Sequence, residues 1–147
     1  MKLTVAWIGK TKHPAIQSLS DEYVKRLKQF VEVDSVSLKD EAALLKLSGR
    51  EGKNSRRYLV LLDSRGKQLS SEDLAQFIRE HQDRNPTPLL FVTGSADGFA
   101  ENTRSHADFT LSLGKMTIAH ELARVVLLEQ LYRAFTILKR HPYHLGH

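Results

Sequence analysis

The chain has 147 residues, 41% of them hydrophobic, which is the usual size of a single domain with one core. It contains no cysteine, which excludes disulfides, thiolate catalysis and cysteine-ligated zinc. The 22 Lys and Arg residues outnumber the 17 Asp and Glu residues, and the formal charge of +5 favours a polyanionic partner without identifying one.

The first predicted element is a strand at residues 3–8. The run LTVAWI is apolar and β-branched and is closed by Gly9, as is typical of a strand buried on both faces. This run is too short for a signal peptide, and no apolar run approaches the roughly 20 residues that a membrane-spanning helix needs. We therefore expect a soluble, cytoplasmic protein that has no membrane partner.

A helix, a strand and a second, shorter helix are predicted next. Pro14 suits a first helical turn, and apolar residues then recur at spacings of three and four on one face. These residues are Ile16, Leu19, Tyr23, Leu27 and Phe30. The alternation in VEVDSVSL, residues 31–38, predicts a strand, and DEAALLKLSGR, residues 40–50, predicts a short helix that Gly49 stops.

The middle of the chain begins with the basic stretch GREGKNSRR, residues 49–57. Such a stretch is typical of a solvated loop, and an RNA-facing patch is the alternative. The run YLVLLD predicts a buried strand with a turn at Gly66 after it. A helix capped by Ser70 or Ser71 should follow. Its expected inward-facing residues are Leu74, Phe77 and Ile78.

Two further strands and a long helix complete the predicted α/β fold. The strands are LLFVTG and DFTLSL, and the helix covers about residues 119–140. Strands that alternate with helices predict one parallel sheet between helices, with residues 1–147 as a single domain. In the last helix, VVLL at residues 125–128 places apolar groups all round the circumference. We therefore expect this helix to pack against a second subunit in a homodimer, and burial within one chain is the alternative.

Two glycine-containing loops follow the last two strands and are the candidate binding segments. FVTGSADGF carries Gly94 and Gly98 just after a strand, where parallel sheets form ligand crevices. The spacing is neither the dinucleotide fingerprint nor the phosphate loop. Gly94 can admit a flat adenosine close to the backbone, or both glycines simply form a turn. The second loop, LGKMT, can read an adenine edge through its main chain, with Met116 expected to pack.

The histidines and the C-terminal tail HPYHLGH are the candidates for proton transfer. His141, His144 and His147 lie beyond a helix end without an accompanying carboxylate, so a metal site is not expected. Tyr143 can stack on a base, and a histidine can bind phosphate or move a proton near neutral pH. On the last helix, Arg133 has Glu129 as an ion-pair partner. Arg124 lacks an equally favourable partner, because Glu121 is only three residues before it, and Arg124 is the better candidate for a phosphate or an interface.

Several motifs together resemble one known family over essentially the whole chain, in order. They are MKLTVAWIGKTK, EYVKRL, LLDSRGKQLSSEDLAQFI, FVTGSADGF, LSLGKMTIAHELARVVLLEQLYRAF and HPYH. They resemble the ribosomal RNA large subunit methyltransferase H family of small SPOUT-class methyltransferases. The resemblance implies a C-terminal trefoil knot, which general topology rules would disfavour, and a homodimer. It also implies methylation of N3 of a pseudouridine in helix 69 of 23S ribosomal RNA on the assembled ribosome, with S-adenosylmethionine and no metal.

The resemblance also implies a set of site residues. The cofactor-binding residues would be Leu62, Gly94, Leu113, Gly114, Lys115, Met116, Thr117 and Ile118. Our hypothesis for catalysis is that His144 and Tyr143 of one subunit close over the cofactor cleft of the other. Arg124 and His120 would position RNA phosphate or the tail. The proton acceptor for N3 stays open between a histidine, a water and the substrate itself.

The chain departs from the family pattern at two positions. Ser95 stands where the family commonly has a second glycine, and Ala119 stands where it has a proline. Neither change removes a group that methyl transfer requires. The alternative function is a non-catalytic RNA-binding or ribosome-binding module that kept the fold. A nucleotide-dependent oxidoreductase is disfavoured because the dinucleotide fingerprint is missing.

Overall fold

The computed structural model describes residues 1–84 and 87–145, so His147 lies outside the described residues. The strands are β1 (Lys2–Ile8), β2 (Glu32–Leu38), β3 (Tyr58–Gln68), β4 (Leu89–Thr93) and β5 (Phe109–Ser112). The helices are α1 (Pro14–Leu27), α2 (Glu41–Leu47), α3 (Ser71–Arg84), α4 (Glu101–Ser105) and α5 (His120–Leu138). Within the described residues, no helix is long and apolar enough to cross a membrane.

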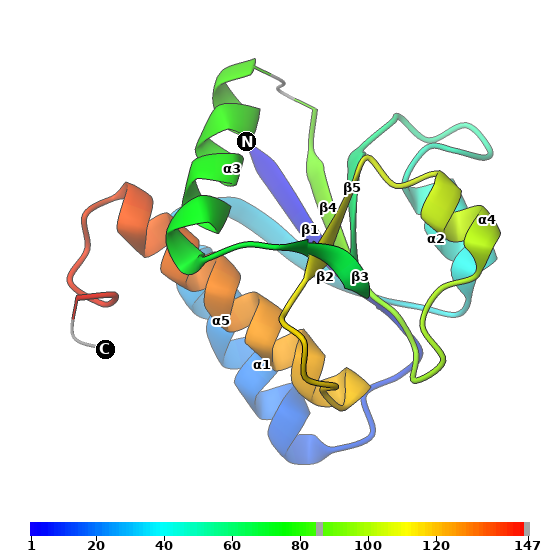
Figure 1. The fold of residues 1–147 in the computed structure, drawn as a ribbon, viewed down its shortest axis with the longest axis horizontal. Helices are drawn as coiled ribbons and strands as arrows, with labels where there is room; N and C mark the ends of the chain where they lie inside the picture. Colours follow the sequence, from blue (N-terminus) through cyan, green and yellow to red (C-terminus); the bar gives the residue numbers. More distant parts are fainter. Residues whose placement is uncertain (85–86, 146–147) are drawn as a thin grey trace.

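The strands form one parallel sheet in the order β2-β1-β4-β3-β5, with helices on both faces (Figure 1). Every residue of the central strand β4 is buried, and so is the middle of β1, because both strands are covered on both faces. Helices α1, α3 and α5 cover one face, where α5 contacts both of the others, and α2 and α4 lie on the other face. The predicted α/β fold is confirmed.

Two details of the predicted elements were wrong. Leu19 does not belong to the buried face of α1, since 46% of it is exposed; Ser20 is buried instead. Gly66 is not the turn after a strand, because β3 continues through it to Gln68. A Cβ on Gly66 would lie 2.6 Å from the carbonyl oxygen of Thr110 on β5, so only glycine allows the two backbones to approach this closely.

The pairing of β3 with β5 is interrupted by a bulge. Leu62 pairs with Leu111, and the register resumes only at Lys67, which pairs with the same residue. The extra residues of β3 therefore leave the ladder and bend the strand. This bulge carries residues 63–65 to the carboxyl edge of the sheet, where they line a cavity.

The basic stretch at residues 49–57 is partly structural, contrary to the expectation of a solvated loop. The side chain of Arg50 is 2% exposed, pairs with the carboxylate of Asp108 and donates to the carbonyl oxygens of Ser48 (2.7 Å) and Arg57 (2.6 Å). Burial raises the pKa of Asp108, but hydrogen bonds from the Leu59 N–H and from Arg50 outweigh this effect and hold the pKa below its ordinary value. Arg50 therefore fixes the loop, and exposed cations such as Arg56 remain at the surface.

Candidate active site

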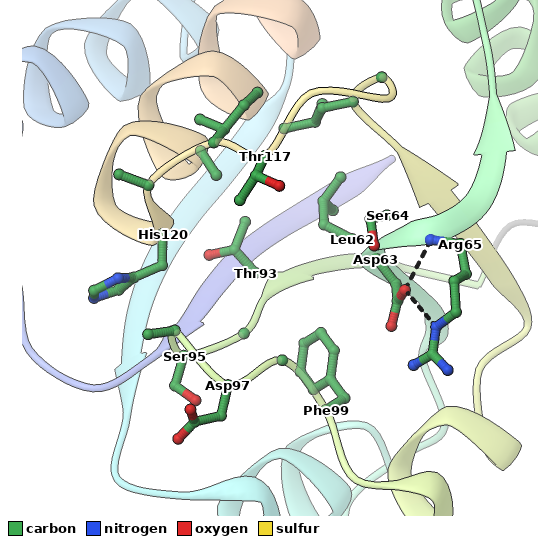
Figure 2. Close-up of a pocket in the computed structure, with 18 of the residues that line it drawn as sticks. Leu62, Asp63, Ser64, Arg65, Thr93, Ser95, Asp97, Phe99, Thr117 and His120 are labelled. Atoms are coloured by element: carbon green, nitrogen blue, oxygen red, sulfur yellow. Dashed lines mark hydrogen bonds and ion pairs between the residues drawn. The ribbon is translucent and has the colours of Figure 1, made fainter.

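A cavity of about 520 Å³ lies at the carboxyl edge of the sheet (Figure 2). Its walls come from the bulge of β3, from the β4–α4 connection that begins at Gly94, and from the segment that joins β5 to α5. Because the strands are parallel, these three segments leave the sheet at the same edge. The volume is in the range of small-molecule sites, which is roughly 300–1,000 Å³.

The cavity gathers most of the residues expected to bind a cofactor. Its lining includes Leu62, Gly94, Leu113, Gly114, Met116, Thr117 and Ile118. Lys115 is exposed and does not line the cavity. Met116 does not pack as expected, because 82% of it is exposed. Two separate stretches of the sequence, which begin about 30 and 50 residues after Leu62, are thus brought against it.

The two glycines of the β4–α4 connection have different physical roles. Gly98 has φ +76° and donates its N–H to the carbonyl oxygen of Ser95 (2.9 Å), so it forms a turn. Gly94 has no unusual φ, but a Cβ there would lie 3.2 Å from the ring of Phe99. A side chain at Gly94 would push this ring, which also lines the cavity.

The second loop is held by the end of β5. The hydroxyl of the buried Ser112 donates to the carbonyl oxygen of Gly114 (3.0 Å) and accepts from its N–H (3.1 Å). Gly114 has φ +132°, a conformation that other residues rarely adopt. The main chain of residues 113–118 is therefore presented to the cavity by a local hydrogen-bonded turn rather than by charged side chains.

Polar side chains that were not among the expected cofactor-binding or catalytic residues also line the cavity. Asp63 is 8% exposed at its side chain and pairs with Arg65 (3.3 Å) and Arg104 (3.9 Å). Thr93, Ser95 and Asp97 come from the end of β4 and the connection after it. The position of Asp63 directly after the run YLVLL was a usable signal, because functional groups gather at the carboxyl ends of parallel strands.

His120, the first residue of α5, lines the cavity as expected for a site residue. The next residue, Glu121, is buried and accepts the backbone N–H groups of Lys12 (3.0 Å) and His13 (3.2 Å). Burial opposes ionisation, but these hydrogen bonds outweigh it and lower the pKa of Glu121. The start of α5 is thus fixed to the β1–α1 connection.

Arg124 does not occupy the position that the sequence suggested. It is fully buried, donates to the Thr11 hydroxyl (2.9 Å) and the Ile8 carbonyl oxygen (3.1 Å), and lies 5.4 Å from the centre of the Trp7 ring. Burial lowers the pKa of Arg124, and Glu121 offsets part of this effect. In this conformation Arg124 cannot reach an RNA phosphate, so the structure corrects its role to that of a buried scaffold residue.

Tyr143 and His144 lie at the other end of α5 and contact the surface of their own chain. The Tyr143 hydroxyl donates to Glu129 (2.9 Å), and its ring meets that of Tyr132 at 4.7 Å. Burial, with hydrogen bonds to Tyr23 and Glu129, raises the pKa of Tyr143 well above its ordinary value, so the phenol stays protonated. The expected ion pair of Arg133 with Glu129 is present at 3.0 Å.

The surroundings of His144 define its hydrogen-bonding state. Its Nδ1 lies 3.0 Å from Nη1 of Arg133, and its Nε2 lies 2.8 Å from the Glu72 carboxylate. Because a guanidinium only donates, Nδ1 accepts and Nε2 carries a proton that it donates to Glu72. His144 follows α5, whose 19 residues span about 28 Å, so one chain does not bring it to its own cavity beside His120.

Comparison with known proteins identifies the family. Residues 1–144 match the family model described as "Predicted SPOUT methyltransferase". The chain is 54% identical over 147 residues to ribosomal RNA large subunit methyltransferase H of Koribacter versatilis, with 100% of both chains covered. The protein of the same name from Geotalea daltonii is 42% identical over 154 residues, covering 98% of this chain and 99% of the relative. The chain belongs to this methyltransferase family.

Solved structures show the same fold. A probable methyltransferase from Bordetella pertussis Tohama I superposes with a TM-score of 0.60 at 11% identity, covering 90% of this chain and 93% of that chain. The SpoU methyltransferase AviRb from Streptomyces viridochromogenes, solved with AdoMet, superposes with a TM-score of 0.54 at 14% identity. That match covers 88% of this chain and 56% of the other. The SPOUT fold class is thereby confirmed, while the trefoil knot and the homodimer stay predictions.

The two departures from the family pattern both fall beside the cavity. Ser95 lies on its wall and accepts the turn hydrogen bond from Gly98 through its carbonyl oxygen. Ala119 is the N-cap of α5 and provides no side-chain cap. Its carbonyl oxygen still accepts from the N–H of Ala123 (2.9 Å), so the helix begins normally. Among the described residues, no group of His, Asp and Glu is arranged to hold a metal ion.

Proposed function

We propose that this protein methylates N3 of a pseudouridine in helix 69 of the large-subunit (23S) ribosomal RNA on the assembled ribosome, with S-adenosylmethionine as the methyl donor. The observation that carries the proposal is the convergence of seven of the eight expected cofactor-binding residues on one cavity. The full-length similarity to proteins named ribosomal RNA large subunit methyltransferase H supports the substrate class. The positive formal charge suits an RNA partner.

The lining of the cavity fits S-adenosylmethionine. Leu62 and Ile118 offer apolar walls for a flat base, and the loop of residues 113–118 offers main-chain donors and acceptors for its edge. Ser95, Asp97 and His120 offer polar contacts for the rest of such a molecule. Bound there, the cofactor would supply a methyl group on a positively charged sulfur that is already a good leaving group.

The remaining chemical requirements fall on the protein. Its residues must hold the RNA so that N3 faces the methyl group in line, and they must exclude competing water. N3 must also lose a proton before or during attack. His120 is the ionisable imidazole at the cavity of the same chain. His144 can take part only after its Nδ1 leaves Arg133 or its Nε2 leaves Glu72.

The proposal includes a homodimer in which one subunit's tail completes the other subunit's cavity. Within one chain the length of α5 separates Tyr143 and His144 from the cavity. On the same helix, Leu122 is 51% exposed, and its neighbours Val125 and Val126 are only partly buried. A second copy packed on this apolar face with the opposite helix direction would carry its tail towards the cavity.

Mass spectrometry of helix 69 tests the proposed activity. Ribosomes from cells that lack this gene should carry an unmethylated pseudouridine, and the purified protein with S-adenosylmethionine should restore the methyl group on these ribosomes. An unchanged methylation state in the mutant cells would refute the substrate assignment. Failure of the purified protein to bind S-adenosylmethionine in calorimetry, even at millimolar concentration, would instead favour a non-catalytic RNA-binding module.

A further inference from the structure

Thr93 is a buried polar residue at the floor of the cavity that the proposed function does not use. It is the last residue of β4 and is 2% exposed. Its hydroxyl has no hydrogen-bond partner among the described residues. Thr93 nevertheless lines the cavity. Figure 2 shows the hydroxyl turned away from Leu62 and towards the side where His120 lies.

Burial of a hydroxyl without a partner costs free energy, so such a group usually indicates a missing ligand or water. The rest of β4 is Leu89, Leu90, Phe91 and Val92, and a valine would suit the strand at its last position as well as a threonine does. The hydroxyl therefore contributes nothing to the strand itself. A polar atom of a molecule bound in the cavity would remove the penalty.

Other buried hydroxyls of the protein show what a structural role looks like. Thr4 accepts from Arg57 (2.8 Å), and Thr136 donates to the carbonyl oxygen of Arg133 (2.6 Å). Within the part of the chain that the structure describes, the hydroxyl of Ser20 also has no hydrogen-bond partner, but Ser20 lies on α1 and does not line the cavity. Thr93 differs from these residues because its hydroxyl has no partner among the described residues and because it lines the cavity.

We propose that the Thr93 hydroxyl hydrogen-bonds bound S-adenosylmethionine, which makes Thr93 a further cofactor-binding residue. The partner atom belongs to the ribose or the amino-acid part of the ligand. The reason is that Leu62 forms an apolar wall suited to the base, and the Thr93 hydroxyl points away from Leu62. Ser95, Asp97 and His120 are further polar residues of the lining. This inference rests on the proposed cofactor.

The test compares Thr93→Val, which removes the hydroxyl and keeps the shape, with Thr93→Ser, which keeps the hydroxyl. Calorimetry with S-adenosylmethionine gives the affinity, and thermal unfolding of the free protein gives the stability. Thr93→Val should weaken binding about tenfold and leave the melting temperature of the free protein unchanged or higher, because it removes an unsatisfied polar group. Thr93→Ser should bind within about threefold of the unchanged protein.

Thr4→Val is the matched control, because it removes a buried hydroxyl that has a partner within the protein. It should lower the melting temperature and leave the affinity within about twofold. Binding of 5′-methylthioadenosine, which has the ribose but no amino-acid group, locates the contact. If Thr93→Val weakens this ligand too, the partner is the ribose; if only S-adenosylmethionine is weakened, the partner is the amino-acid part.

Three results would overturn the inference. Equal binding by the unchanged protein and Thr93→Val would overturn it alone and leave the proposed function intact. A loss of affinity in Thr93→Val that is accompanied by a lower melting temperature, as in Thr4→Val, would assign a structural role to Thr93 and also overturn it. Absence of binding by the unchanged protein would overturn both this inference and the proposed cofactor.

Discussion

The two ends of α5 carry the candidate site residues in contrasting ways. At its start, Glu121 and Arg124 are buried and fix the helix to the β1–α1 connection beside the cavity. Past its end, Tyr143 and His144 are held by Glu129, Arg133 and Glu72 in a more open setting. The buried end forms a rigid scaffold, whereas the tail depends on contacts that can be exchanged. Mutations of Glu121 and Arg124 at the start of α5 should lower the stability of the fold. Mutations of the tail should lower the methylation activity.

Removal of the tail should have the largest effect on activity. A protein truncated after Lys139 loses Tyr143 and His144 but keeps α5, which ends at Leu138. We expect loss of methylation by at least about a hundredfold, with a folded protein and cofactor binding retained. Methylation of ribosomes, calorimetry with S-adenosylmethionine and circular dichroism check this together. Full activity of the truncated protein would contradict the role of the tail.

Substitution of the buried arginine should have the largest effect on stability. Arg124→Ala leaves the Ile8 carbonyl oxygen without its donor and Glu121 without a neighbouring cation. We expect a loss of about 3 kcal/mol or more in the free energy of unfolding, measured by denaturant titration. A change below about 1 kcal/mol would show that Arg124 is not part of the scaffold.

Arg133 offers the matched arginine at the other end of the same helix. Its guanidinium pairs with Glu129 and contacts Nδ1 of His144 at the surface. Arg133→Ala should lower the free energy of unfolding by no more than about 1 kcal/mol and reduce methylation about tenfold, because the tail loses its anchor. If Arg133→Ala destabilised the protein as much as Arg124→Ala does, the contrast between the two ends would disappear.

The scaffold end should also show a specific dependence on pH. The pKa of Glu121 is below its ordinary value of 4.5, so its carboxylate stabilises the fold fully above that pH. This contribution is lost as the pH falls through the lowered pKa. Glu121→Gln should therefore be less stable than the unchanged protein at pH 7, and the difference should shrink as the pH falls below 4.5. A difference that is constant from pH 7 to about pH 3 would contradict the assignment.

The smallest effect is expected at Lys115. The sequence resemblance placed it among the cofactor-binding residues, but its side chain is exposed and outside the cavity lining. Lys115→Ala should leave the affinity for S-adenosylmethionine within about twofold in calorimetry. A tenfold loss would show that the loop rearranges when the cofactor binds.

The strands and the cavity were predictable because each depends on local pattern. Apolar runs such as LTVAWI can be buried only between two layers, and loops after parallel strands must meet at one edge. The bulge at Gly66 depends on the backbone of β5, about 45 residues further along the chain, so strand periodicity alone could not reveal it. The role of Arg124 depends on Thr11, separated from it by 113 residues. The sequence near Arg124 showed only that its possible partner, Glu121, was less favourably spaced than the partner of Arg133.

Activity of a mixed dimer tests most directly whether the two ends of α5 belong to one site made by two subunits. One subunit is truncated after Lys139, and the other carries Thr117→Trp, which fills the cavity that Thr117 lines. Each variant alone should be inactive. The purified heterodimer should regain about half of the wild-type methylation of ribosomes, because one cavity and one tail from different subunits remain intact. An inactive heterodimer that still forms and binds S-adenosylmethionine would contradict the shared site.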